Sequence, residues 1–208
     1  MKRITFLTAA MLLASFGAQA QNEKLIHYGD GPKDTINVIS GQKTVLKEAG
    51  ATYSFAVDFS EAHIVNFNRE FSVEKDHGLV DDFNAAKGAD YVKDWPVDVK
   101  ILTQVACQKI SKKLKVPYTP ASESTGARYD VVMKLAWFDL GCFVAIGGVK
   151  DGGNIAKGIM YVYDGGTDNV VASFDVNYLR GNNVGYGNRE RMTQFGGNIA
   201  DAIKKLLK

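Results

Sequence analysis

The sequence predicts a two-layer α/β sandwich of the α+β class, with a mostly antiparallel sheet of four or more strands and two long helices on one face. Three successive segments are strand-like, Arg128–Phe138, Ile155–Tyr163 and Val170–Leu179, and in the first and last apolar residues alternate with mostly polar ones. Two others, Val97–Val116 and Arg189–Leu207, space apolar residues as helices do. Because amphipathic strands and helices bury their apolar sides against each other, these segments predict one core between two layers.

Residues 1–20 are typical of an export signal. Lys2 and Arg3 precede the apolar run Ile4–Phe16, and Ala18-Gln19-Ala20 forms a small-residue cleavage site. The alternative, a membrane anchor, is disfavoured because the run is shorter than the roughly 20 residues that cross a bilayer. The residue after the cut is Gln21 and not cysteine, so we expect a periplasmic or secreted protein that is not a lipoprotein.

The charge balance gives no reason to expect a polyanionic partner. The chain has 25 Lys+Arg and 23 Asp+Glu, and cleavage removes Lys2 and Arg3, which leaves a neutral protein. We therefore expect binding neither to nucleic acid nor to anionic lipid. No later segment approaches membrane-spanning length, so no transmembrane segment is expected after cleavage.

The amino-terminal part after the signal, residues 21–50, is predicted to lie outside the main domain. Gln21–Lys33 is polar and contains Gly29, Gly31 and Pro32, which favours a flexible leader. Thr35–Ile39 and Lys43–Lys47 flank Ser40-Gly41 and are interpreted as a small edge hairpin. Residues 51–208 then form a single domain.

This domain is predicted to begin with the strand Thr52–Phe59, in which every second residue is apolar. The strand continues through Ala62–Val65 after a bulge. Asn66–Trp95 is interpreted as a short helix or an irregular cover over the sheet.

The first long helix, Val97–Val116, begins after Pro96 and ends before Pro117. Four lysines crowd its last turns: Lys109, Lys112, Lys113 and Lys115. Such a cluster invites a nucleic-acid hypothesis. A water-facing carboxyl-terminal turn, where cations suit the helix dipole, is favoured because the whole chain is neutral.

The second long helix, Arg189–Leu207, has the cleanest period in the chain. Its apolar face is formed by Met192, Phe195, Ile199, Ile203 and Leu206. Gly196 lies beside this face, and close approach to a strand is the expected compensation for its cost in a helix.

Residues that carry chemistry are sparse, and no cofactor or metal is predicted. The histidines His27, His63 and His77 show no metal-ligand spacing, and two distant cysteines do not form a zinc cluster. The Gly-rich run 147–153 lacks the Gly-Lys-Ser/Thr ending of a phosphate loop. Asp58, Glu61 and His63 fall near one strand end, although strand alternation favours a solvent-facing placement for them.

The two cysteines, Cys107 and Cys142, allow two interpretations. In an oxidising compartment the pair can form a disulfide, and otherwise both are buried thiols. Cys142 belongs to an apolar, glycine-flanked segment between two strands, Leu140–Gly148. There Phe143, Val144 and Ile146 either contact a partner or tuck into the sheet edge.

Several features together carry a resemblance. They are the export signal, the strand Thr52–Phe59, Trp95 before a helix, the strand start Ala127–Val132, the hairpin Met160–Phe174 and the closing helix. The pattern over Thr52–Leu207 resembles secreted and periplasmic bacterial proteins of unknown function. Their domain is similar in plan to envelope accessory domains such as the TolB amino-terminal domain and the activator lipoproteins of penicillin-binding proteins. This chain departs from the lipoproteins because it lacks their lipid-attachment cysteine.

The resemblance implies a non-catalytic role in the envelope and supplies no catalytic residues. We therefore expect a non-enzymatic exported protein, a protein-binding or accessory module whose partner is another envelope protein or a second copy. The proposed contacts are a sheet edge and the loop Gly141–Gly153. Two alternatives stay open: a periplasmic hydrolase with a site around Asp58 and His63, and a carrier of a small apolar ligand.

Overall fold

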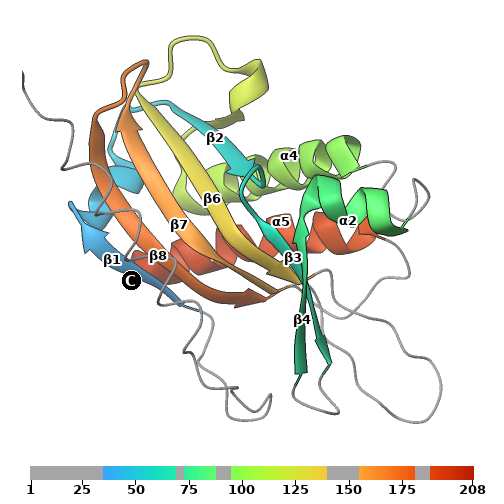
Figure 1. The fold of residues 1–208 in the computed structure, drawn as a ribbon. Coiled ribbons are helices and arrows are strands. Elements are labelled where there is room, and N and C mark those ends of the chain that lie inside the picture. The colour runs from blue at the N-terminus through green and yellow to red at the C-terminus, as the bar shows by residue number, and fades with distance from the viewer. Residues whose placement is uncertain (1–34, 69–72, 88–94, 140–154, 181–187) are drawn as a thin grey trace, which may run out of the picture.

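The computed structural model describes residues 35–68, 73–87, 95–139, 155–180 and 188–208 (Figure 1). The strands are β1 (Thr35–Ser40), β2 (Tyr53–Asp58), β3 (His63–Asn68), β4 (Val73–Leu79), β5 (Tyr118–Pro120), β6 (Tyr129–Asp139), β7 (Ile155–Asp164) and β8 (Val170–Arg180). The α-helices are α2 (Val80–Lys87), α4 (Trp95–Leu114) and α5 (Asn188–Leu206), and the 3-10 helices are η1 (Lys43–Lys47) and η2 (Ala121–Glu123).

All eight described strands belong to one sheet, in the order β1-β8-β7-β6-β2-β5, with β3 and β4 off this path. Four pairings are antiparallel: β1 with β8, β8 with β7, β7 with β6, and β3 with β4. The other three are parallel and join β2 to β5, β2 to β6 and β3 to β6. The prediction of a mostly antiparallel sheet of at least four strands is confirmed.

Strand β6 is central because it has three partner strands. It pairs with β7 along one edge and with β2 and then β3 along the other. Tyr53 pairs with Tyr129 at the start of β2, and His63 pairs with Trp137 at the start of β3. Between the two strands the chain makes a tight turn in which the Ala62 amide donates to the Phe59 carbonyl at 3.0 Å. The second strand is present where the sequence predicted a continuation, but a turn and not a bulge separates β3 from β2.

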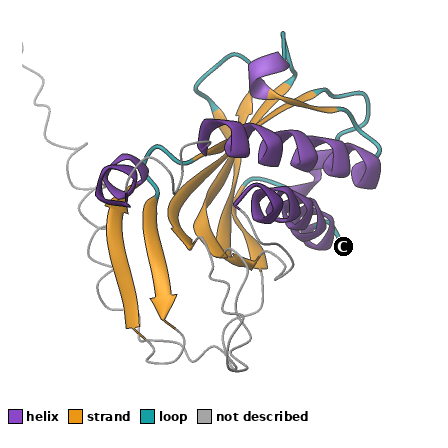
Figure 2. Cartoon of the chain, turned by 90° about the vertical axis from the view of Figure 1, so that its right-hand side faces the viewer, coloured by secondary structure: helices purple, strands orange, loops and turns teal. Residues whose placement is uncertain are grey.

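Helices α4 and α5 lie side by side on one face of the sheet (Figure 2). The largest fully buried side chains include Phe55 of β2, Phe138 of β6, Phe174 of β8 and Phe195 of α5. The two predicted long helices and their placement on one face are confirmed. Among the described residues no helix has both the length and the apolarity needed to cross a membrane.

Gly196 permits a close contact, though its neighbour is a helix and not the expected strand. A Cβ atom at this position would lie 2.5 Å from the Leu102 carbonyl oxygen of α4. Later along both helices, Lys113 of α4 forms an ion pair with Asp201 of α5. Because contacts at 102 and 196 are followed by contacts at 113 and 201, α4 and α5 run in the same direction.

The predicted hairpin over Thr35–Ile39 and Lys43–Lys47 is wrong. Its first half is β1, whose partner is β8, so this strand belongs to the main sheet. Its second half is η1, which closes over the core: Leu46 is fully buried, and its carbonyl accepts a hydrogen bond from the Tyr118 hydroxyl at 2.8 Å. Local alternation had suggested a strand, but burial of Leu46 against distant aromatic residues determines the outcome.

Between β3 and α4, the described part of the segment Asn66–Trp95 contains the two regular elements β4 and α2. Strand β4 pairs antiparallel with β3, and α2 follows it directly. The predicted short helix is present, whereas the strand before it was not predicted. The positive φ of Gly78, +79°, lies at the junction between the two elements.

Candidate functional site

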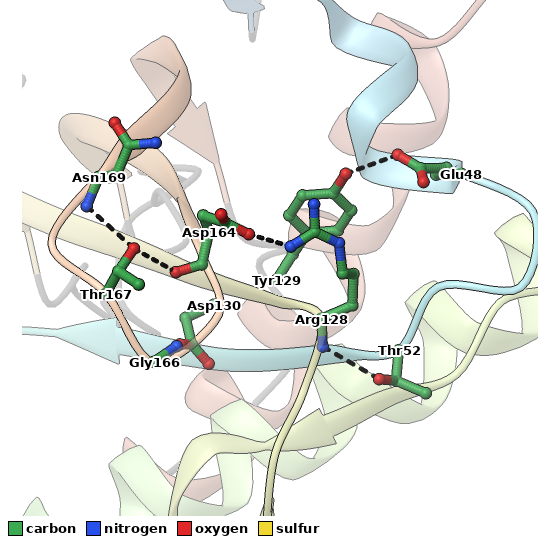
Figure 3. Close-up of polar contacts among 9 residues, drawn as sticks. All are labelled: Glu48, Thr52, Arg128, Tyr129, Asp130, Asp164, Gly166, Thr167 and Asn169. Carbon is green, nitrogen blue, oxygen red and sulfur yellow. Dashed lines mark hydrogen bonds and ion pairs between the residues drawn. The ribbon is translucent and has the colours of Figure 1, made fainter.

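One end of the sheet carries a dense hydrogen-bonded network where β6 begins and the β7–β8 turn folds over it (Figure 3). The Arg128 guanidinium pairs with Asp164 and lies 4.7 Å from the centre of the Tyr129 ring. The Tyr129 hydroxyl donates to Glu48 at 2.6 Å, and the Arg128 amide donates to the Thr52 hydroxyl at 3.1 Å. The hydrogen bond to Asp164, together with its charge, raises the pKa of Arg128, which stays charged.

The turn itself is held by short-range bonds. The Thr167 hydroxyl donates to the Asp164 carbonyl at 2.7 Å and accepts from the Asn169 amide at 3.2 Å (Figure 3). A Cβ at Gly165 would lie 2.0 Å from the Ala127 carbonyl oxygen, so only glycine fits there. These bonds close the turn on itself, and Gly165 lets it approach the residues just before β6.

A shallow hollow of about 230 Å³ opens beside this turn. It is lined by Ser54, Ala121, Ser124, Gly126, Ala127, Asp130, Gly165 and Gly166. The Asp130 carboxylate accepts from the Ser54 hydroxyl and, at 2.9 Å, from the Gly166 amide. Ser54 and Asp130 are register partners on β2 and β6, so this pair ties two strands together. The hollow is smaller than the roughly 300–1,000 Å³ of typical small-molecule sites.

The residues of the hydrolase alternative interact with separate partners. Burial acts to raise the pKa of Asp58, but hydrogen bonds from Ser60 and the charge of Lys134 outweigh it and lower the pKa. His63 Nδ1 lies 2.8 Å from the Asp76 carboxylate, across the β3–β4 pair, and both side chains are about half exposed. Glu61 is exposed in the turn before β3. Exposed pairs of this kind contribute little to stability.

Metal-binding groups are not gathered either. Within the described ranges, no three His, Cys, Asp or Glu side chains lie close enough together to hold an ion. His77 falls in β4, and His27 lies outside the described residues.

Two predicted contacts, the disulfide and the partner-binding loop, involve residues outside the described part of the chain. Cys107 is buried in α4, and burial raises the pKa of its thiol to about 12. Its predicted partner Cys142 lies outside the described residues, so the disulfide stays a prediction. The same holds for the partner-contact residues Phe143, Val144 and Ile146 and for the glycine-rich run 147–153.

The sheet has three edge strands in its described part: β1, β4 and β5. An edge strand presents backbone donors and acceptors that a further strand can pair with, and proteins usually block this with charges, proline or short length. Strand β5 has three residues and ends in Pro120. Strand β4 carries Glu74, Lys75 and Asp76 in its sequence. Both edges therefore carry features that oppose further pairing.

Strand β1 lacks these features. Its six residues, Thr35–Ser40, include neither a charged residue nor proline. Val38 is 47% exposed and Ile39 is 55% exposed, more than the other exposed apolar strand residues whose side chains are described, Leu79 at 39% and Val170 at 42%. The register to β8 shifts between Val38 and Ser40, so Ile39 is the bulged residue. The uncharged, β-prone run of this edge is visible in the sequence, but its local pattern predicts a hairpin and not an edge of the main sheet.

Comparisons with known proteins give no family. No family model and no curated protein matches the chain. Among solved structures, a dodecamer of a PelC variant from Paraburkholderia phytofirmans is 14% identical, with 83% of this chain and 98% of that chain covered and a TM-score of 0.39. A second PelC dodecamer from the same organism is 14% identical, with 83% and 96% covered and a TM-score of 0.38. Likenesses at this level give no basis for transferring a property to this chain.

Proposed function

We propose that this chain is a non-enzymatic exported protein of the cell envelope that binds another protein by accepting an added strand at β1. The observation that carries the proposal is the contrast among the three edges, since β1 alone among the described edges is long, uncharged and apolar. Addition of a strand to an open sheet edge is a common way to recognise an extended peptide.

The energetics favour a contact of moderate strength. Each backbone hydrogen bond formed at the edge contributes about 0.5–1.5 kcal/mol net. Burial of Val38 and Ile39 against the incoming strand adds a hydrophobic contribution, because both are about half exposed in the free protein. A six-residue strand covers less than the roughly 800 Å² per partner of a standard interface, so a transient complex is expected.

The non-enzymatic part of the proposal is supported by the polar residues at the sheet end. Asp130, Asp164 and Arg128 each have a partner that holds a strand or turn in place. Export is supported by the signal-like residues 1–20, which end before the first described strand. The apolar-ligand carrier is not favoured by any observation, since the hollow at the sheet end is small and partly polar.

The test uses the chain from Gln21, which contains every described element. Tagged protein recovers binding partners from envelope extract, and Val38→Lys is compared with Val97→Lys. The two valines are matched because each is 47% exposed, but Val97 belongs to α4 and not to an edge strand. We expect Val38→Lys to lower recovery of the specific partner at least about tenfold, since a lysine on an edge strand opposes pairing. Val97→Lys should leave recovery unchanged.

Ile39→Lys provides a second substitution at the same edge, in case lysine at position 38 disturbs the neighbouring core. Both edge variants should unfold within about 0.5 kcal/mol of the wild type, as surface substitutions do. Equal recovery by all variants would remove β1 as the contact. Recovery of the chain itself as the specific partner would identify self-association through this edge.

A further inference from the structure

The parallel arrangement of α4 and α5 brings lysines together that lie about ninety residues apart in the chain. The two helices lie side by side on the outside of the sheet, and their carboxyl-terminal ends are neighbours (Figures 1 and 2). The carboxyl-terminal half of α4 contributes Lys109, Lys112 and Lys113, and that of α5 contributes Lys204 and Lys205. We call these five residues the basic surface.

Contacts between the helices show that these lysines share one side. The Lys109 ammonium lies against Gly197 of α5, because a Cβ built there would be 2.9 Å from its Nζ atom. One turn later, Lys113 pairs with Asp201. Lys112 follows Lys109 at three residues, and Lys204 and Lys205 follow Asp201 at three and four residues, which places each of them on the same side of its helix as that residue.

The balance of charge on this side is strongly positive. In the described stretches 105–114 and 197–206, Asp201 is the single acidic residue beside five lysines. Lys109, Lys112, Lys204 and Lys205 are exposed, and the Asp201 carboxylate is taken by Lys113. The near-neutral total of the chain therefore conceals a local concentration of positive charge on this surface.

The chemistry of the basic surface distinguishes between kinds of anionic partner. It contains lysine and no arginine, so it lacks the planar fork that binds single phosphates or carboxylates in a bidentate manner. Lysines are mobile point charges on long stems, which suit a surface of many dispersed negative charges. Clusters of four to eight basic residues on a helical surface are typical of binding to anionic lipid.

From this arrangement we infer that the basic surface docks the protein on a membrane that contains anionic phospholipid. The helices lie along the bilayer with their carboxyl-terminal halves against the headgroups. The opposite face of the sheet does not contribute to this contact. Favourable interaction of lysines with the helix dipoles explains why each helix ends in cations, but it does not require the two ends to lie together.

The test measures co-sedimentation of the chain from Gln21 with vesicles of phosphatidylcholine alone or mixed equally with phosphatidylglycerol. We expect binding to the mixed vesicles at about 50 mM salt, release at about 300 mM salt, and no binding to the neutral vesicles. The double variant Lys112→Glu/Lys205→Glu should bind the mixed vesicles on the order of 30-fold less. Both positions are exposed, so circular dichroism should show an unchanged fold.

A matched control has the same change in total charge at other places. Lys100→Glu/Lys134→Glu replaces two exposed lysines, one in the amino-terminal half of α4 and one on β6. It should bind the mixed vesicles within about twofold of the wild type. Absence of wild-type binding, or equal loss in both double variants, would overturn the proposal. Retention on heparin or duplex DNA without vesicle binding would also overturn it and point to another polyanion.

Discussion

The strands at the two ends of the strand order, β1 and β5, both have an edge with unpaired backbone groups, but they differ in the features that oppose pairing there. Strand β5 has features that oppose further pairing. The Tyr118 amide donates to the Ser111 hydroxyl at 2.8 Å, the Tyr118 hydroxyl donates to the Leu46 carbonyl, and Pro120 ends the strand. Strand β1 is twice as long, carries no charge and exposes Val38 and Ile39. Among the described strands, β1 is therefore the edge with the fewest features that oppose pairing with a further strand.

The largest expected effect breaks β1 away from the sheet. Gly41 follows β1 with a φ of +71°, and a Cβ there would lie 2.3 Å from the Val171 carbonyl oxygen of β8. Gly41→Ala should therefore lower the free energy of unfolding by about 2–4 kcal/mol and also reduce partner recovery. Urea unfolding measures the first effect.

Gly50→Ala is the control for backbone strain alone, since Gly50 has a φ of +79° and no atom within 4 Å of the built Cβ. It should cost only about 1 kcal/mol. If the two variants lose equal stability, the close approach of Gly41 to β8 does not anchor β1.

A smaller effect is expected at the β5 edge. Tyr118→Phe removes the donor to the buried Leu46 carbonyl and should cost about 1–2 kcal/mol without changing partner recovery. Thermal or urea unfolding checks the stability, and the recovery assay checks the partner. Loss of the partner in this variant would show that the β5 side, and not β1 alone, supports binding.

The smallest expected effect is the alkaline pH dependence that comes from a buried thiol near β5. Burial raises the pKa of the Cys107 thiol to about 12 from an ordinary 9, and charge interactions place this thiol near Tyr118. Burial disfavours the charged thiolate, so the unfolded chain loses the thiol proton at lower pH than the folded protein does. The stability linked to Cys107 is complete below about pH 9 and is lost as the pH rises toward 12.

Urea unfolding between pH 8 and 10.5, with reductant present, compares the wild type with Cys107→Ala. The free energy of unfolding should fall with pH in both, and less steeply in the variant. Equal slopes would contradict a buried thiol that titrates only on unfolding. Strand β1 contains no ionisable side chain, so alkaline pH should not act on that edge directly.

The sequence was sufficient for elements whose own residues encode a buried face. The long strands and the two helices have regular periods, and their bounds in the structure differ from the predicted ones by at most two residues. Strand β1 could not be assigned in this way, because its partner β8 lies more than 130 residues away and no local pattern indicates that pairing. The basic surface could not be predicted either, because it depends on the direction of α5 relative to α4, which no local pattern indicates.

The candidate contact residues also differ in whether the local sequence alone can indicate them. Phe143, Val144 and Ile146 were chosen for apolar composition, and they lie outside the described residues. Val38 and Ile39 have a similar composition, but their role depends on being at an edge, which only the sheet order reveals. Composition can propose an apolar contact, whereas exposure on an edge strand distinguishes it from a core residue.

The most direct test of the central claim places a photo-crosslinking amino acid at position 39 of β1 or at position 79 of β4 and irradiates living cells. Both residues are exposed and apolar, Ile39 at 55% and Leu79 at 39%, and both belong to edge strands. The account predicts a specific protein adduct from position 39 and none from position 79. An adduct from position 79 alone, or the same adducts from both, would contradict β1 as the edge that binds the partner.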